Sequence, residues 1–431
     1  MELRMKKVSL IAVAVATTLA AGSAFAVDFN GYMRAGTGIS ASGSGDVSVN
    51  KNGIGRLGNE NDNYSEFGFS EELKTGEQTW RLESMIASGA PGENGWEDAD
   101  FNVAQFAVKA KGLISSDKEA TIWAGKTYYQ RKDIHITDFY FLNTSGTGGG
   151  VENLSIGDQK LSVALIQDNG SQTSDTDKYG WVPGANPGDA PTWGVVDKES
   201  EDVTGYIADV RLANIGLWSD ASLEVAMAYN FATSTDGQSV KGDDGLLVTG
   251  IIHQGMDNGF NQTVLQYGTN GYGVQAANFW GAGSYYDRSG DQNDATGYRL
   301  INWGVMNLGE SWEMGHQLAY LAGSDIGASK QDIDQYSIVA RPMYKWNDTM
   351  RTVFEAGYNA GEKINGAGNG VEDFGNAKFT VAQAWAMGDS FWARPEIRVY
   401  GSYILDTEND NAFGTNEDTE YVAGIQVEAW W

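Results

Sequence analysis

Four aromatic residues of the chain share a strand face with ionisable side chains, if each segment is read with the two-residue period of a strand. The pairs are Tyr32 with Arg34, Tyr64 with Glu66, Trp392 with Arg394, and Trp430 with Glu428. Aromatic rings stack on the apolar C–H face of a sugar, and charged groups hydrogen-bond the hydroxyl groups around its rim. The pattern therefore predicts successive weak sugar-binding positions. The alternative is a girdle at a membrane interface, because a one-residue bulge would reverse the faces.

Patterns typical of enzymes and metal sites are absent from the sequence. The three histidines, His135, His253 and His316, are scattered, and neither a G-x-S-x-G nor an H-E-x-x-H motif occurs. The acidic segment between Asp406 and Asp418 is typical of a solvated loop, although carboxylates could also bind Ca²⁺ weakly. We predict a protein that is not an enzyme and has no cofactor and no metal site.

The elements that must position these residues are strands. Residues 222–232, 397–405 and 421–431 follow a two-residue period in which one face is mostly apolar and the other carries most of the polar residues. A soluble sandwich would turn the apolar face inward, whereas an outer-membrane barrel turns it toward lipid and lines its lumen with the polar face. The mixture of charge and aromatic rings on the polar face favours the barrel, as does closure, which leaves no unpaired backbone in lipid.

Composition and charge narrow the class further. The chain has 431 residues, of which 56 are Gly, 6 Pro and 12% aromatic, and no stretch after residue 26 is long enough for a membrane-spanning helix. Roughly 22 residues for each strand and its connection gives about 18 strands. The net charge of −28 argues against binding to nucleic acid and to anionic lipid headgroups.

The first 26 residues have the order of a secretory signal peptide. Three basic residues lie within the first seven positions, an apolar run extends from Val8 to Ala21, and a small-residue cleavage motif ends at Ala26. We predict a signal peptide at 1–26, a single all-β barrel domain at 27–431, and an outer-membrane location. The absence of cysteine excludes disulfides.

Segments rich in Gly, Asn, Asp and Ser separate the strand-like runs. They predict long surface loops at 168–202, 233–246, 286–295, 361–376 and 406–419. In outer-membrane barrels, long loops are extracellular and short turns are periplasmic.

The sequence resembles the maltoporin family, the trimeric sugar-specific porins of Gram-negative outer membranes. The resemblance covers nearly all of 27–431. It is densest at VDFNGY (27–32), RLGNE (56–60), TIWAGKTYYQRKDIHITDFYFLNTSGTGGGVEN (121–153), RPMYKW (341–346), GDSFWARP (388–395) and the final Trp430-Trp431. It implies an eighteen-stranded barrel with a constriction loop, about Asp138–Val151, folded into the lumen. It also implies facilitated diffusion of maltose and maltodextrins through a homotrimer embedded in outer-membrane lipid.

The resemblance also implies which residues bind the sugar. The aromatic slide would consist of Tyr32, Tyr64, Phe260, Trp392 and Trp430, with Trp96 contributed to the neighbouring subunit. The polar track would consist of Arg34, Arg56, Glu66, Arg131, Asp133 and Asp138, with Tyr140 narrowing the constriction. One track arginine of the family is replaced by Asn102, and the outer loops differ, so the preferred sugar stays open.

Three other functions stay open at this point. The barrel could be a porin for a different sugar or a general diffusion porin, in which the aromatic residues give only shape. It could be an adhesion or receptor barrel whose loops bind partners, and the sequence does not decide whether phages use it as a receptor. An outer-membrane enzyme would require a nucleophile–base pair, which no motif in the sequence indicates.

Overall fold

A computed structural model describes residues 27–43, 45–90, 101–182, 192–232, 241–280, 286–288, 290–366 and 368–431. The predicted signal peptide at 1–26 and Trp96 lie outside the described residues. In the described part of the chain, no helix combines the length and apolar character needed to cross a membrane.

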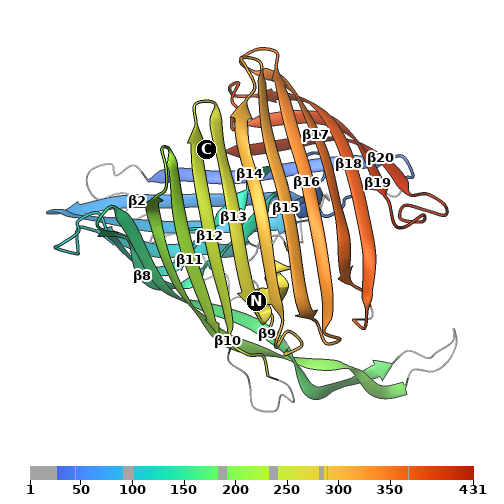
Figure 1. Cartoon of the computed structure of the whole chain (residues 1–431), viewed down its shortest axis with the longest axis horizontal. Helices are drawn as coiled ribbons and strands as arrows, with labels where there is room; N and C mark the ends of the chain where they lie inside the picture. Colours follow the sequence, from blue (N-terminus) through green and yellow to red (C-terminus); the bar gives the residue numbers. More distant parts are fainter. Residues whose placement is uncertain are drawn as a thin grey trace, which may run out of the picture.

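Eighteen antiparallel strands form one sheet that closes on itself, as the sequence predicted (Figure 1). Strands that follow one another in the chain pair with one another, and β1 pairs with β20, which places Tyr32 opposite Trp430. The strands are β1 (Asp28–Ser40), β2 (Asn63–Thr75), β3 (Gln78–Ala90), β4 (Asn102–Lys111), β5 (Thr121–Thr127), β8 (Gly146–Ile156), β9 (Gln159–Val182), β10 (Thr192–Gly216), β11 (Ala221–Phe231), β12 (Gly245–Met256), β13 (Gly259–Thr269), β14 (Thr296–Asn307), β15 (Trp312–Ile326), β16 (Gln331–Lys345), β17 (Met350–Ile364), β18 (Val371–Ala386), β19 (Glu396–Asp406) and β20 (Thr419–Trp430).

The two faces of the wall follow the alternation of the sequence. On β11, Val225 and Met227 are exposed, whereas Ala226 and Ala228, which alternate with them, are buried. The buried face is the inner one. Gln266, a buried residue of β13, donates a hydrogen bond to Phe141, which belongs to a segment folded inside the barrel. Apolar side chains therefore cover the outside of the barrel, where lipid would solvate them.

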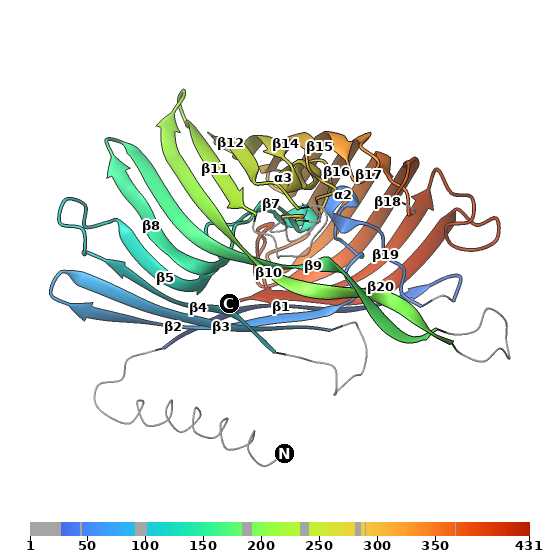
Figure 2. The same ribbon diagram turned by 90° about the horizontal axis from the view of Figure 1, so that it is seen from below.

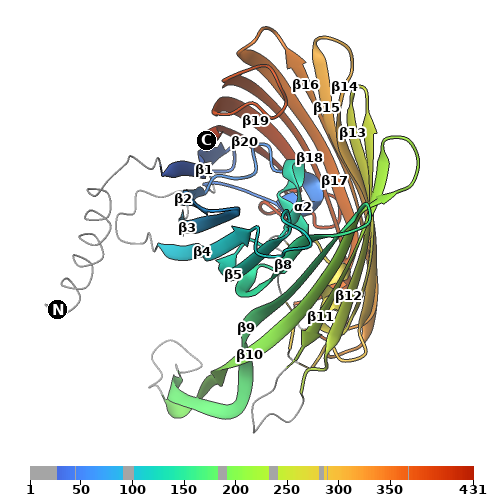
Figure 3. The same ribbon diagram turned by 90° about the vertical axis from the view of Figure 1, so that its left-hand side faces the viewer.

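Short turns and long connections lie at opposite ends of the barrel. Two residues connect β2 to β3, β8 to β9, and β12 to β13, whereas the connections at the other end are mostly longer. The loop predicted at 168–202 is wrong in its bounds, because β9 and β10 extend through most of it as a hairpin beyond their neighbours (Figure 3). The loop predicted at 361–376 is likewise mostly strand, whereas the loop at 406–419 is confirmed.

Three connections fold into the barrel (Figure 2). Residues 128–145 form a short hairpin of β6 (Lys132–Ile134) and β7 (Phe139–Leu142), joined by the 3₁₀ turn η1 (His135–Thr137). The other two carry the short helices α2 (Lys51–Ile54) and α3 (Gly271–Ala276). We call residues 128–145 the inserted hairpin.

The inserted hairpin is fixed to several strands of the wall. Thr137 donates a hydrogen bond from its hydroxyl group to Gln317 at 2.7 Å, and Gln266 donates to the Phe141 carbonyl oxygen at 2.9 Å. Ile134 and Phe139 are completely buried between the hairpin and the wall. The hairpin leaves the wall after β5 and returns to it at β8, and it contacts β13 and β15 in another part of the wall. It therefore extends across the inside of the barrel.

The bounds predicted for the constriction loop, Asp138–Val151, are wrong. Gly146–Val151 belong to β8, where they pair with β5 and β9 as part of the wall. The glycine run allows close strand approach, because a Cβ atom at Gly148 would lie 2.2 Å from the Leu165 carbonyl oxygen. The inward fold begins earlier, at Tyr128, immediately after β5 ends.

Candidate functional site

A cavity of about 490 Å³ lies between the inserted hairpin and strands β1, β2 and β20. Its lining includes ten of the thirteen site residues expected from the sequence. They are Tyr32, Arg34, Arg56, Tyr64, Glu66, Arg131, Asp133, Asp138, Tyr140 and Trp430. Lys51 and His135 complete the lining. Residues from distant parts of the sequence therefore meet in one place within the lumen.

Aromatic residues form a row across β2, β1 and β20. The centroids of the Tyr64 and Tyr32 rings are 6.1 Å apart. Tyr32 lies opposite Trp430 in the sheet register. The His135 ring lies 5.6 Å from Trp430 and 5.3 Å from Trp392, so it connects these two indoles. The row thus runs from Tyr64 to Trp392, with His135 as a member that the slide prediction did not contain.

Ionisable side chains flank this row. Arg34 and Lys51 donate hydrogen bonds to Asp138 at 3.2 and 2.6 Å. The Arg131 guanidinium lies over the Tyr140 ring, 4.8 Å from its centroid. On the wall, Glu66 accepts a hydrogen bond from the Tyr64 hydroxyl group at 2.7 Å. The cavity therefore offers cationic donors and carboxylate acceptors beside the aromatic surface.

The buried carboxylate of Glu428 binds three arginine side chains next to the aromatic row. It accepts hydrogen bonds from the Tyr32 hydroxyl group at 3.1 Å and from Arg394 Nε at 2.9 Å. It also forms ion pairs with Arg56 at 3.1 Å and Arg398 at 3.2 Å. Its carboxylate is almost fully buried, so these partners replace its water. The network sets the orientation of Tyr32, and Arg394 also lies 4.6 Å from the Trp430 ring centroid.

Burial and neighbouring charges change the pKa values of the groups on the inserted segments. Burial, reinforced by Arg56 and Arg394, lowers the pKa of His135 well below its ordinary value despite Glu428, so the imidazole is neutral. Burial alone would raise the pKa of Asp138, but Arg56 and Lys51 lower it, so the carboxylate stays charged. Burial raises the pKa of Asp133, although Arg131 opposes this change.

Two expected site residues, Phe260 and Trp392, do not line the central cavity. Phe260 is near the start of β13 and contacts Trp303, and it does not line the central cavity. Trp392 lies just before β19, and it contacts the row through His135. The prediction that Trp392 and Arg394 share a strand face was therefore wrong, because the strand begins only at Glu396. Trp96 is outside the described residues, and Asn102 is the exposed first residue of β4.

Sequence reasoning missed Lys51 and His135 as lining residues. Lys51 is on α2, which enters the lumen between β1 and β2, and no periodic pattern identifies so short a helix. His135 had a signal, since it follows a dense cluster of charges at Arg131–Asp133. In the part of the chain that the structure describes, no group of three or more His, Asp or Glu side chains is placed to hold a metal ion.

A closed antiparallel barrel with an apolar outside and a lumen lined with polar and aromatic groups is the architecture of an outer-membrane porin. The family model described as LamB porin matches residues 27–431, and the chain belongs to this family. Membership confirms the predicted resemblance and the prediction that the protein is a channel and not an enzyme.

Several curated proteins named maltoporin are similar to the chain. A maltoporin from Vibrio cholerae is 70% identical over 446 residues, which cover 100% of both chains. A maltoporin from Vibrio parahaemolyticus is 67% identical over 294 residues, or 68% of this chain and 94% of its own. Maltoporin 1 from Klebsiella pneumoniae is 36% identical over 447 residues, with 98% of each chain covered.

Proposed function

We propose that the protein is a sugar-specific porin that gives facilitated diffusion of maltose and maltodextrins. The observation that carries the proposal is the aromatic row of the central cavity with charged groups along its side. The similar proteins from Vibrio cholerae are maltoporins, and their 70% identity over nearly the whole chain supports maltodextrins as the sugar class.

In this proposal, the apolar face of each glucose unit stacks on the row between Tyr64 and Trp392. Its hydroxyl groups exchange water for Arg34, Arg131 and Asp138. Aromatic contacts contribute about 0.5–1.5 kcal/mol each, so a sugar is held loosely and can advance by one ring at a time. The inserted hairpin narrows the path, and Tyr140 and Arg131 lie at the constriction.

Replacing Trp392 with alanine tests the slide. We expect the mutation to weaken block of single-channel current by maltohexaose about 3- to 10-fold, which is the range of one lost aromatic contact. Salt conductance in the absence of sugar should stay close to that of the wild type, because Trp392 does not line the central cavity.

The matched control is Trp346→Ala, because Trp346 is an exposed indole that contacts Tyr344, away from the cavity. We expect no change in block for this variant. If no oligosaccharide blocks the wild-type channel, the protein is a general porin, and the proposal is wrong.

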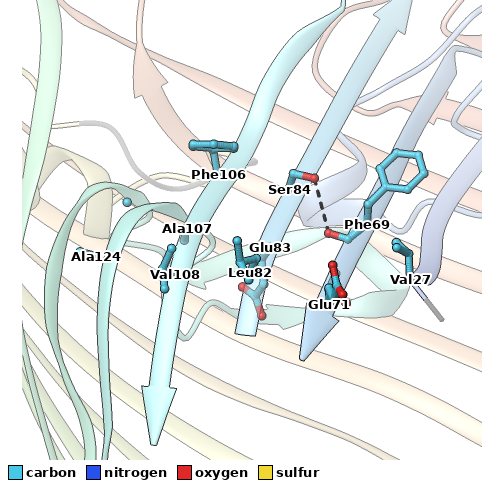
Figure 4. A pocket seen from close by; sticks show the side chains of 12 residues that line it. Val27, Phe69, Glu71, Leu82, Glu83, Ser84, Phe106, Ala107, Val108 and Ala124 are labelled. Atoms are coloured by element: carbon cyan, nitrogen blue, oxygen red, sulfur yellow. Dashed lines mark hydrogen bonds between the residues drawn. The ribbon is translucent and has the colours of Figure 1, made fainter. Parts of the chain in front are cut away.

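We also propose that the protein works as a homotrimer, with β1–β5 in the subunit interface. β5 has seven residues, fewer than the roughly 9–11 that cross a bilayer, so this wall needs cover other than lipid. An apolar cavity on the outside of these strands is lined by Val27, Leu82, Phe106 and Val108 (Figure 4). Phe106 is 70% exposed in the single chain. Trp96 would then reach the aromatic row of the neighbouring subunit.

The Phe106→Ala variant tests the interface. Burial of one aromatic side chain contributes about 1.5–3 kcal/mol, so each trimer contact should weaken by that amount. On unheated SDS gels, we expect the trimer band to dissociate at a lower temperature. Leu265→Ala is the control, because Leu265 is also apolar and exposed, and it lies on β13, which pairs with β12 and β14 and is separated from β1–β5 by several strands in both directions around the barrel. Equal dissociation temperatures for the two variants would contradict the proposed interface.

The export route is also part of the proposal. Residues 1–26 would direct secretion and be removed, which places the mature N-terminus at Val27, immediately before β1. The first residue found by N-terminal sequencing of the purified outer-membrane protein tests this step.

A further inference from the structure

The connection between β18 and β19 reaches the inserted hairpin from the opposite end of the barrel. It comprises residues 387–395 and lies at the end with the short turns, although it is longer than most of them. Phe391 is buried, and a Cβ atom at Gly315 of β15 would lie 2.9 Å from its ring and 3.1 Å from the Ile136 side chain of the hairpin. We call residues 387–395 the lower connection.

The guanidinium group of Arg351 binds the backbone of the lower connection on both sides of Trp392. Arg351 is a buried residue of β17. Its Nη1 donates a hydrogen bond to the Ser390 carbonyl oxygen at 2.5 Å, and its Nη2 donates to the Ala393 carbonyl oxygen at 2.9 Å. Its Nε donates to Glu396 at 2.6 Å, where β19 begins. One planar group with several donors therefore fixes the path of the chain around Trp392.

The position of the Trp392 ring depends on this backbone. The side chain is 37% exposed, and its ring centroid lies 5.3 Å from those of Phe391 and His135. Glu313 of β15 accepts a hydrogen bond from the Phe391 backbone N–H at 2.8 Å, so the chain is also held immediately before Trp392. Because more than a third of the residue faces open space, packing alone does not fix the indole.

We propose that Arg351 is a positioning residue for sugar binding, which keeps the Trp392 ring at the end of the aromatic row. The inference rests on the proposed function and concerns a residue that does not touch the sugar, because its guanidinium group is buried behind the lower connection. If the connection were free, the ring would take several positions. Sugar binding would then have to order the ring first, which lowers affinity.

The alternative is that Arg351 only balances the charge of Glu396. The carboxylate of Glu396 already has a second cation, because Arg398 Nη1 lies 3.2 Å from its other oxygen. What Arg351 adds beyond the ion pair is the pair of bonds to the Ser390 and Ala393 carbonyl oxygens. These bonds favour a role in positioning the lower connection.

A double-mutant cycle with Trp392 separates the two roles. We expect Arg351→Met to weaken block of single-channel current by maltohexaose about 3- to 10-fold, and no more than Trp392→Ala does. In the Trp392→Ala background, the same substitution should change block by less than about 2-fold, because its effect goes through the missing ring. Equal losses in both backgrounds would overturn the inference, since a purely structural role does not depend on the indole.

Two further variants complete the experiment. Arg351→Lys keeps a positive charge beside Glu396, but a single ammonium group lacks the planar fork that reaches both carbonyl oxygens. We expect its block to lie between those of the wild type and Arg351→Met. Arg81→Met is the matched control, because Arg81 of β3 donates hydrogen bonds to Glu83 and Ser70 of the wall. Its block should equal that of the wild type.

The outcomes separate the positioning role from the function on which it rests. If maltohexaose blocks the wild type and Arg351→Met equally, while Trp392→Ala weakens block, the positioning role alone is overturned. A wild-type channel that no oligosaccharide blocks would overturn both. If Arg351→Met gives no folded channel, Arg351→Lys carries the test, because it keeps the buried ion pair. Weaker block that disappears in the Trp392→Ala background would then support the inference, and unchanged block would reject it.

Discussion

The Glu428→Gln variant is expected to lower the free energy of unfolding by about 3–5 kcal/mol, the range for removing one partner of a buried ion pair. The change keeps the shape of the side chain and removes its charge. It leaves Arg394 without its carboxylate and deprives Arg56 and Arg398 of one of theirs. All three cations are buried, so water can replace little of the lost interaction.

The same substitution should reduce sugar affinity by an order of magnitude or more. The Tyr32 hydroxyl group would lose its 3.1 Å bond to the carboxylate, and Arg394 would lose the group that holds it near Trp430. Two members of the aromatic row, Tyr32 and Trp430, would then each lose one of the interactions that orient them. Urea unfolding in detergent measures the stability, and current block by maltohexaose measures the affinity.

Glu83→Gln is the control for this variant. Glu83 pairs with Arg81 and Lys109, and the side chains of all three are about one-fifth or more exposed. Such pairs contribute about 0–1 kcal/mol because water competes for the charges. Similar losses of stability in the two variants would contradict the central position that the structure gives to Glu428.

The sequence predicted those parts of the fold that depend on a local period. Alternation along 421–431 gave the strand and its faces, and Gln426 and Glu428 are buried toward the lumen as expected. Length and spacing gave eighteen strands. The limits of loops were harder to predict, because Asp, Ser and Gly are frequent in loops and also occur in the polar outer halves of β9 and β10. Composition alone cannot separate a hydrated strand from a loop.

The site was predictable where parity and family resemblance agreed. Tyr32, Tyr64 and Trp430 are on regular strands, so their direction follows from the alternation. Trp392 was assigned to a strand that begins four residues later, and only the resemblance identified it. Lys51 depends on how one connection folds into the lumen. That path is determined by contacts with distant strands, which no local pattern contains.

Two of the three inward connections are bound at one carboxylate, Glu355 of β17. It accepts hydrogen bonds from the Leu57 backbone N–H at 3.0 Å and from Lys378 at 2.7 Å, and Arg341 binds its other oxygen. Arg341 also donates to the Ile136 carbonyl oxygen of the inserted hairpin at 2.9 Å. The carboxylate thus connects the segment that carries Arg56 to the hairpin that carries Asp138.

Gly55 allows the inward connection to pass close to the Glu355 carboxylate. Gly55 has a φ of +100°, and a Cβ atom there would lie 2.4 Å from the Glu355 carboxylate. Only glycine therefore lets the backbone approach Glu355 so closely without strain. Glu355 also forms ion pairs with the fully buried Lys378 and the buried Arg341.

Replacing Glu355 with alanine is accordingly expected to release both segments from the wall. The uncompensated cations should lower the free energy of unfolding by about 3–5 kcal/mol. In channels that still fold, we expect larger and noisier salt conductance, because the inserted hairpin no longer stays in one position. Sugar block should weaken, because Arg56 and Asp138 move away from the aromatic row.

The Glu372→Ala variant separates this effect from any loss of charge on the same strand pair. Glu372 of β18 pairs with Lys363 of β17 at 3.2 Å, and both side chains are about half exposed. We expect its stability to change by less than about 1 kcal/mol, with conductance and block unaltered. An unchanged conductance in Glu355→Ala would mean that other bonds suffice to hold the hairpin, such as Thr137 to Gln317. The carboxylate would then stabilise the barrel without controlling the width of its path.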